Sequence, residues 1–394
     1  MIGTRLDDVD SPRLIRSNYG WWFLGNETWT LLEPGQVLPD GTVCADIDEF
    51  LQEKGAYQPR LPKAFALTVL TTTTCNLGCG YCFQNTALDP TGGNRPSRIG
   101  RQRLDSETID RIIKFTAERM ACADLRKLDV LLFGGEPLLN PQGCLTVLDR
   151  ARSIGMRAAS IATNGVLLTP EMAQDLNTAG LTSAQVTFDG NRELHDQIRV
   201  THAGGATFDN IVNNVARASE VTDLQWTLRI NVSHRNYEGI GKVFSEWEGR
   251  LDPNRCLLSF AWVGDAGFGY ANDLQKVAEV GKAFVDWHIA AAEAGYQIVR
   301  PGMKTTCQTC SVPGGRHGAV VNADGSLYSC WQSAGKPNFK VGSVEDGYMN
   351  TEHTAQRWVQ CGYEYKTAAK PAVDDFQDRI DGQILDYLYE TGRL

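Results

Sequence analysis

The sequence lacks features that would direct a protein to a membrane, to export or to nucleic acid. No apolar run in its 394 residues approaches the roughly 20 needed to cross a bilayer. The stretch MIGTRLDDVDSPRLIRS has no apolar core of the kind that a signal peptide needs. Positive charge is scarce, since 38 Lys and Arg face 47 Asp and Glu, and nucleic-acid-binding proteins are more often basic. We therefore expect a cytoplasmic protein with no membrane partner and no nucleic-acid partner.

Eleven cysteines in such a chain indicate metal binding rather than disulfides, because the cytosol keeps thiols reduced. Two groups stand out from the rest. The first group consists of Cys75, Cys79 and Cys82. The second group consists of Cys307, Cys310 and Cys330, with Cys361 following. Four cysteines stand alone and are expected to be small buried hydrophobes, namely Cys44, Cys122, Cys144 and Cys256.

Strand-like and helix-like segments alternate between about residues 63 and 260, which predicts parallel strands joined by crossover helices. Six strands are expected, in FALTVLTTT, LDVLLFG, RAASIATNG, SAQVTFDG, LQWTLRINVS and CLLSFAWV. Ser106 and Thr169 are predicted N-caps of the helices that follow them. A further periodic helix is expected over 273–295, with His288 as an ordinary face residue rather than a ligand.

The segment TVLTTTTCNLGCGYC joins a buried strand to a loop that carries the first three cysteines. Iron–sulfur cubanes normally take four cysteine thiolates, so three local thiolates leave one iron free for a ligand that is not protein. A zinc loop is the alternative, and it would need a fourth ligand from elsewhere in the chain.

Three further segments place polar residues at strand ends. Gly134-Gly135-Glu136-Pro137 combines glycines, which let backbone approach closely, with an acceptor carboxylate. Thr163 and Asn164 end the next strand, and VTFDGNRELHDQIR follows with Asp189 and Arg199. His195 and Asp196 of that segment are expected to be structural partners in its turn rather than acid–base catalysts.

The C-x3-C-x2-C loop, the GGEP turn and the D-G…H-D-x-x-R segment together resemble the radical S-adenosylmethionine (SAM) enzymes of the SPASM and sulfatase-maturase branch. Thr187 stands where that branch usually has serine. The resemblance implies a [4Fe–4S] cluster on Cys75, Cys79 and Cys82 that binds SAM and cleaves it to a 5′-deoxyadenosyl radical. It also implies a set of SAM contacts, namely Tyr81, Gly134, Gly135, Glu136, Pro137, Thr163, Asn164, Asp189, Arg199 and Asn231.

The segment CQTCSVPGGRHGAVVNADGSLYSCW resembles the core of the SPASM and twitch domains, and its spacing predicts a β-hairpin with Asp324-Gly325 at the turn. Only one cysteine, Cys361, follows Cys330, so the full SPASM pattern is not present. The resemblance implies a single auxiliary [4Fe–4S] cluster with four candidate ligands, namely Cys307, Cys310, Cys330 and Cys361. If Cys307 or Cys361 is not a ligand, one iron is open, and zinc in these cysteines is the alternative.

The fold class that follows is α/β, a partial (β/α)6 barrel of TIM type with a small β-rich iron–sulfur domain and a short N-terminal α+β extension. The expected divisions are 1–62 for the extension, 63–262 for the barrel, 263–300 for a linking helix and 301–394 for the auxiliary domain. The extension is either a module that recognises a leader peptide or a cover for the barrel.

The resemblance implies oxidative modification of a ribosomally made precursor peptide, with electrons from a flavodoxin or ferredoxin. Asp265 and Tyr270 lie after a late strand and are the candidates for proton removal. Two alternatives stay open. One is dehydrogenation or rearrangement of a small metabolite, and the other is a non-catalytic iron–sulfur or zinc protein.

Overall fold

The computed structural model describes residues 11–84, 99–263, 278–303, 307, 309, 314–358 and 370–394. Four predicted site residues lie outside these ranges, namely Asp265, Tyr270, Cys310 and Cys361. In the part of the chain that is described, no helix is both long and apolar enough to cross a membrane.

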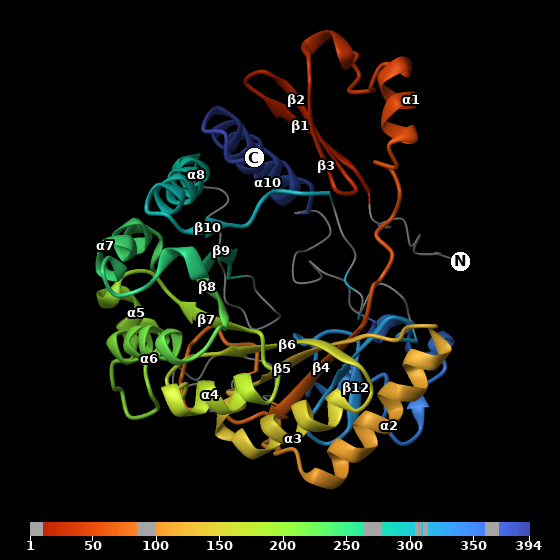
Figure 1. Ribbon diagram of the computed structural model, residues 1–394, viewed down its shortest axis with the longest axis vertical. Helices are drawn as coiled ribbons and strands as arrows, with labels where there is room; N and C mark the ends of the chain where they lie inside the picture. The colour runs from red at the N-terminus through yellow and green to blue at the C-terminus, as the bar shows by residue number, and fades with distance from the viewer. Residues whose placement is uncertain are drawn as a thin grey trace.

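Six parallel strands follow one another in sequence order, as the alternating pattern predicts. They are β4 (Phe65–Thr72), β5 (Leu128–Gly134), β6 (Met156–Thr163), β7 (Ser183–Phe188), β8 (Gln225–Val232) and β9 (Cys256–Trp262). The crossover helices are α2 (Ser106–Cys122), α3 (Pro141–Arg152), α4 (Pro170–Thr178), α5 (Arg192–Ile198), α6 (Phe208–Val221) and α7 (Val243–Trp247). Figure 1 shows the strands in an arc with helices along its outer side. The α/β partial-barrel prediction is confirmed.

The two faces of this sheet differ in chemistry. On the helix side, apolar residues such as Ile161, Val186 and Leu228 are fully buried in the main core. On the opposite, inner face, alternate positions carry polar side chains such as Gln185, Arg229 and Ser259, which are only partly buried. A closed TIM barrel fills this inner space with bulky branched side chains. The polar inner face here is therefore suited to ligands rather than to packing.

Helix starts follow the sequence closely. Thr169 is confirmed as an N-cap, with its hydroxyl accepting from the Met172 amide at 3.3 Å. The prediction for Ser106 is wrong by one residue, because Asp105 caps α2 by accepting from the Thr108 amide at 2.8 Å. The Asp105 carboxylate reaches the third amide of the helix, and Ser106 becomes its first residue.

The C-terminal hairpin is confirmed and continues the barrel sheet. Strand β11 (Gly318–Val321) runs parallel to β4 and antiparallel to β12 (Ser326–Tyr328), with Gly325 at φ +80° in the turn. Two short strands complete this edge, β13 (Gly342–Ser343) and β14 (Gly347–Tyr348). The hairpin that leads to Cys330 therefore lies beside β4, the strand that leads into the first cysteine group.

The N-terminal segment forms an antiparallel sheet whose two faces are both covered. Its strands are β1 (Arg13–Ser17), β2 (Gly20–Gly25) and β3 (Thr28–Leu32), followed by α1 (Ala45–Glu53). Phe23 packs with Leu51 of α1, whereas Trp22 packs with Leu385 of the C-terminal helix α10 (Lys370–Glu390). Figure 1 shows α10 beside this sheet, away from α2 and α3.

Polar contacts fix α10 to the N-terminal sheet. The carboxylate of Asp386 accepts from the Trp22 indole at 2.7 Å and from the Asn18 amide at 2.9 Å. Gly382 brings the helix close to β1, because a Cβ atom there would lie 2.5 Å from the Arg16 carbonyl oxygen. The first and last segments of the chain thus form one packed layer.

Helix α8 (Ala278–Glu293) joins this layer to the barrel. Its Phe284 contacts Trp262 of β9 and Phe376 of α10, at ring-centroid distances of 4.6 Å and 6.1 Å. His288 is buried 4.5 Å from the Phe260 ring, and its Nδ1 lies 2.7 Å from the Phe284 carbonyl oxygen. This surrounding fits a core histidine. The strand β10 (Gln297–Ile298) then pairs with β9 and ends the sheet.

Candidate cofactor site

The cysteine loop that follows β4 is held by the segment after α5. The Gly78 amide donates to the Val200 carbonyl at 2.9 Å, and Leu77 forms an isolated bridge with Thr201. His202 lies with Nε2 3.0 Å from the Cys75 carbonyl oxygen. The loop that carries Cys75, Cys79 and Cys82 is therefore fixed by a segment more than 100 residues away.

The thiols of this loop are largely shielded from water. Burial raises the pKa of Cys79 to about 12 and raises the pKa of Cys75 as well. Across the described residues, no three His, Cys, Asp or Glu side chains converge closely enough to hold a metal ion as they stand. The donor set nonetheless fits an iron–sulfur cluster, since three cysteines of one loop are soft ligands in a site shielded from solvent.

The glycine turn after β5 brings backbone against this loop. A Cβ atom at Gly134 would lie 2.2 Å from the Thr72 carbonyl oxygen, and one at Gly135 would lie 2.5 Å from that of Thr74. The Gly135 and Glu136 amides donate to these same two carbonyls, each at 2.9 Å. Only glycine permits this approach, which places Glu136 beside the residue preceding Cys75.

Glu136 is fully buried and joins two strand ends. One carboxylate oxygen accepts from the Thr163 hydroxyl at 2.7 Å, and the other accepts from the Asn164 amide at 2.7 Å. Asn164 in turn donates its side-chain amide to the Asn76 side chain at 2.7 Å and approaches the Cys75 sulfur at 3.8 Å. Burial raises the pKa of Glu136, and these donors offset part of that effect. The predicted residues of β5 and β6 thus meet at the cysteine loop.

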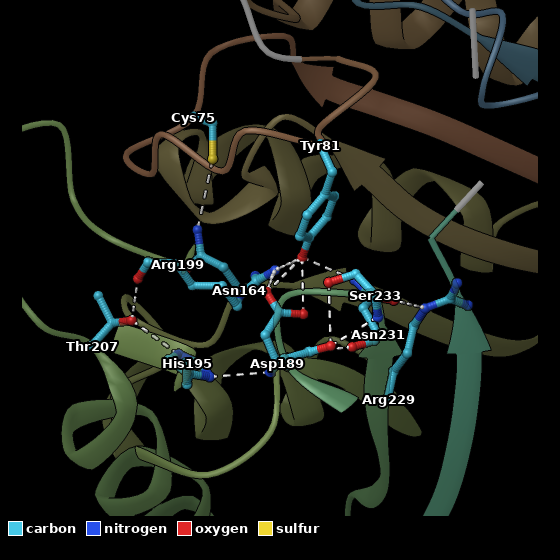
Figure 2. Close-up of polar contacts among 11 residues, drawn as sticks. Cys75, Tyr81, Asn164, Asp189, His195, Arg199, Thr207, Arg229, Asn231 and Ser233 are labelled. Carbon is cyan, nitrogen blue, oxygen red and sulfur yellow. Dashed lines mark hydrogen bonds and ion pairs between the residues drawn. The ribbon is translucent and has the colours of Figure 1, made fainter. Parts of the chain in front are cut away.

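The phenol of Tyr81 gathers three other predicted residues (Figure 2). It donates to the Asp189 carboxylate at 2.8 Å, and it accepts from Arg199 at 2.9 Å and from the Asn231 side chain at 3.0 Å. Arg199 and Asp189 also form an ion pair at 3.8 Å. Burial raises the pKa of Asp189 to about 6, although Arg199 opposes this effect. The sequence resemblance implies a place for Tyr81 near adenine; here its hydroxyl links β7, α5 and β8.

A second set of contacts holds the backbone of Arg199 in place. His195 lies with Nε2 3.1 Å from the Thr207 hydroxyl, which donates to the Arg199 carbonyl at 2.6 Å. Asp196 accepts from the Thr207 and Phe208 amides at the start of α6. Burial lowers the pKa of His195 well below its usual value, so the ring is neutral. These contacts give His195 and Asp196 structural roles.

One buried atom in this network has unused hydrogen-bonding capacity. The Nε of Arg199 is buried and has no hydrogen-bond partner, although buried polar atoms are usually paired. Arginine is suited to a carboxylate because its guanidinium presents several donors in a fixed plane. The methionine carboxylate of SAM is a group of that kind, so the residues present fit the cofactor that the motifs imply.

The second cysteine group is described only in part. Cys330 is buried at the end of β12, and its carbonyl accepts from the Ser333 amide and hydroxyl. Cys307 lies with its sulfur 3.1 Å from the Thr309 hydroxyl. The other two predicted ligands, Cys310 and Cys361, lie outside the described residues, as do Asp265 and Tyr270. The auxiliary cluster and the candidate bases stay predictions.

Three residues near the site were missing from the sequence-based set. Thr207 and His202 support the loops, and nothing in their sequence surroundings marks them. Arg229 lies on the inner face of β8, two residues before Asn231, and its Nε donates to the Asn231 side chain at 2.8 Å. Strict alternation in LRINV could have revealed it, because Arg229 and Asn231 must share one face of the strand.

Comparison with known proteins agrees with this geometry. Residues 69–241 match the profile of the radical SAM superfamily. The chain is 32% identical to the AdoMet-dependent heme synthase of Methanosarcina barkeri over 177 residues, which cover 44% of each chain. It is 24% identical to the mycofactocin maturase MftC of Mycolicibacterium smegmatis over 307 residues, covering 75% of this chain and 71% of that one.

The fold is also similar to a solved structure, native anSMEcpe with bound AdoMet and Cp18Cys peptide. The TM-score is 0.61 at 16% identity, and the match covers 83% of this chain and 99% of that one. The chain spans less than half the length of the heme synthase that it matches. Residues 69–241 are a radical SAM domain, and over a longer stretch the chain is similar to the maturase MftC.

Proposed function

We propose that this enzyme uses SAM and a [4Fe–4S] cluster on Cys75, Cys79 and Cys82 to modify a ribosomally made precursor peptide oxidatively, through a C–C or C–S crosslink or a related change. The observation that carries the proposal is the meeting of residues from the cysteine loop, β7, α5 and β8 at the Tyr81 hydroxyl. A structural zinc loop would not require that polar network beside it.

The residues around the loop have distinct tasks in this proposal. Glu136 and the strand end at Thr163 and Asn164 receive the amino group of SAM, and Arg199 pairs with its carboxylate. Asp189 and Asn231 take the ribose. When bound, the cluster and SAM supply a 5′-deoxyadenosyl radical that abstracts hydrogen from the substrate. The protein's own part is to orient both partners and to keep water away from them.

The peptide substrate is supported by two of the similar proteins. MftC is named a maturase, and the solved structure with a similar fold contains a peptide together with AdoMet. The N-terminal sheet with α1 is proposed as the part that receives the leader of the peptide. Asp265 or Tyr270 would remove the proton that accompanies oxidation. A flavodoxin- or ferredoxin-type donor would reduce the cluster.

An auxiliary [4Fe–4S] cluster on Cys307, Cys310, Cys330 and Cys361 would accept the electron that an oxidative modification releases. Its position is supported by β11, which places the hairpin ending at Cys330 next to β4. The first cysteine loop follows β4 itself, so Cys330 and this loop belong to neighbouring parts of one sheet.

A small-metabolite substrate is the second candidate. The higher identity to a heme synthase, 32% against 24% for MftC, favours it, although that match covers only 44% of this chain.

Analysis of the reaction products would distinguish a peptide substrate from a small metabolite. Peptides encoded near the gene should be incubated with the reduced enzyme and SAM, and mass loss of two hydrogens per crosslink would identify oxidative maturation. Turnover of a tetrapyrrole with no change in any peptide would favour the alternative.

Iron and sulfide content after anaerobic reconstitution tests the cofactors directly. Two cubanes predict about eight irons in the wild type and about four in the Cys75/Cys79/Cys82→Ala variant. The same measurement on Cys44/Cys122/Cys256→Ala, which removes three lone cysteines, should leave about eight. About four irons falling to none would show that the C-terminal cysteines hold no iron, and an oxidative mechanism would then lack its electron acceptor.

A further inference from the structure

Arg229 is a charged residue on the inner face of the barrel that the proposed SAM contacts leave unused. In the parallel register it stands between Thr187 of β7 and Ser259 of β9, neither of which carries a charge. The adjoining inner positions, Gln185 and Thr227, are also uncharged. The guanidinium is therefore the one charge in this patch of the inner face.

Arg229 has only part of its hydrogen-bonding capacity satisfied. Its Nε donates to the Asn231 side chain at 2.8 Å, and no Asp or Glu of the described residues lies within ion-pair distance. Figure 2 shows its side chain reaching away from the Tyr81 network, joined to it only through this bond. Burial lowers the pKa of Arg229, although Tyr81 and Asp189 of the neighbouring network partly oppose this effect. A charge in such surroundings is costly unless a partner compensates it.

Other arginines of the barrel show what the usual compensation looks like. Arg199 has Asp189 as its ion-pair partner, and Arg157 on β6 pairs with Asp129 of the adjacent strand. Both carboxylates come from the chain itself. Arg229, which lies on the inner face of the sheet and is partly exposed, has no such carboxylate within ion-pair distance among the described residues.

We infer that Arg229 anchors a carboxylate of the substrate inside the barrel. This inference rests on the proposed function and specifies the substrate as a peptide that presents its C-terminal carboxylate or an Asp or Glu side chain. Guanidinium and carboxylate match in charge and in planar geometry, which fixes orientation as well as affinity. The abstracted hydrogen would then lie at a set distance from the anchored group.

The position on β8 separates this role from that of the cofactor residues. The Arg229 backbone lies two residues, about 7 Å, before Asn231 along the strand, and its side chain extends back so that Nε lies 2.8 Å from the Asn231 side-chain oxygen. Asn231 accepts from Arg229 and donates to Tyr81, so it links the two sites through one side chain. A substrate carboxylate at Arg229 would therefore lie beside the proposed SAM contacts, and the link would let each ligand favour the ordering of the other.

Chemical modification tests the anchor without relying on turnover. The reconstituted enzyme would be treated with phenylglyoxal, and the adduct on Arg229 would be quantified by peptide mass spectrometry, with Arg157 as the internal reference. The probes are a pool of N-acetyl tripeptides with free C-terminal carboxylates, the same pool amidated, an amidated pool containing Asp and Glu, and SAM alone.

The result expected is at least tenfold slower modification of Arg229 with one of the carboxylate-bearing pools and none with the neutral amidated pool. Protection by the acid-ended pool identifies a C-terminal carboxylate, and protection by the Asp and Glu pool identifies a side chain. Equal protection by SAM alone would assign Arg229 to the cofactor and overturn the inference. Lack of protection by every probe would also overturn it.

Kinetics provide the second measurement once a peptide is turned over. Arg229→Gln should raise the KM for that peptide by roughly a hundredfold, and Arg229→Lys should recover part of the loss because it restores the charge. SAM affinity measured by equilibrium dialysis should change by no more than about threefold. A matching loss of SAM affinity would overturn the inference. Absence of iron or of SAM cleavage in the wild type would instead refute the proposed function.

Discussion

The cofactor end of the barrel and the layer formed by the N-terminal sheet with α10 are held together in opposite ways. At the cofactor end, buried charged and polar groups from distant loops meet, as at Tyr81 and Glu136. In the layer, apolar faces dominate, with Phe23 toward α1 and Trp22 toward α10, and buried polar contacts such as those of Asp386 and Asp381 are confined to the side that faces α10.

This difference reflects what each region has to do. Buried charges contribute little to stability after their desolvation is counted, so a network such as that of Arg199 and Asp189 is better explained by ligand binding. Apolar packing stabilises without directing chemistry. We therefore expect changes at the cofactor end to affect both stability and SAM affinity, and changes in the packed interior of the layer to affect stability without changing SAM affinity.

The largest effect is expected from Arg199→Met. The change leaves Asp189 buried without its charged partner, and breaking a buried pair of this kind costs about 3–5 kcal/mol. SAM binding should also be lost. Urea unfolding and equilibrium dialysis measure the two effects. Arg157→Met, which breaks an ion pair whose side chains are 40% and 38% exposed, is the control and should cost at most about 1 kcal/mol.

Helix α8 joins the two regions, and the burial of its His288 can be tested through the pH dependence of stability. Burial lowers the pKa of His288 to about 4, whereas an unfolded histidine has a pKa near 6.5. Between these values the unfolded chain binds more protons, so stability should fall as the pH is lowered, by about 2 kcal/mol at pH 5. Unfolding free energies of the wild type and His288→Gln should converge or cross as pH falls. His353→Gln, at an exposed position, is the control.

The layer depends instead on close backbone contact at one glycine. Gly→Ala inside a helix normally stabilises by up to about 1 kcal/mol. At Gly382 the added Cβ would lie 2.5 Å from the Arg16 carbonyl oxygen, so we expect destabilisation by about 2 kcal/mol. Gly281 of α8 is the matched control, because its Cβ would only contact Phe376 at 3.5 Å. Equal effects of Gly382→Ala and Gly281→Ala on the melting temperature would refute the close contact between Gly382 of α10 and the Arg16 carbonyl of β1.

The two regions also differ in how far the sequence predicts them. At the cofactor end, the predicted residues Tyr81, Asp189, Arg199 and Asn231 meet at one point, because ligand chemistry imposes residue types at fixed places after strands. The parallel strands and their crossover helices followed from the alternation of strand-like and helix-like segments. Arg229 was missed because a single charge in a strand resembles a surface residue until its face is known.

In the layer, the sequence predicted elements but not their partners. A short α+β extension was expected over residues 1–62, whereas the packing of its sheet on α10 was not. Nothing local signals that Asp386 will accept from Trp22, since the two are 364 residues apart. Apolar faces combine with any complementary face, so pattern alone leaves the choice open. The shift of the N-cap by one residue has a separate, local cause. Asp105 and Ser106 are both favoured N-cap residues, so pattern alone leaves the choice between them open.

The smallest effect on stability, and the one that best separates the regions, is expected from Tyr81→Phe. The hydroxyl is shared by Asp189, Arg199 and Asn231, but Asp189 and Arg199 keep their direct ion pair, so the loss should be about 1 kcal/mol. SAM affinity should nonetheless fall by roughly tenfold, because Arg199 and Asn231 lose the group that orients them.

Tyr57→Phe removes a hydroxyl of the same chemistry from the N-terminal segment, where it donates to Asp48. It should cost a similar free energy of unfolding and leave SAM affinity unchanged. If Tyr81→Phe destabilised the protein by several kcal/mol without weakening SAM binding, the Tyr81 network would be structural like the layer, and the contrast between the two regions would disappear.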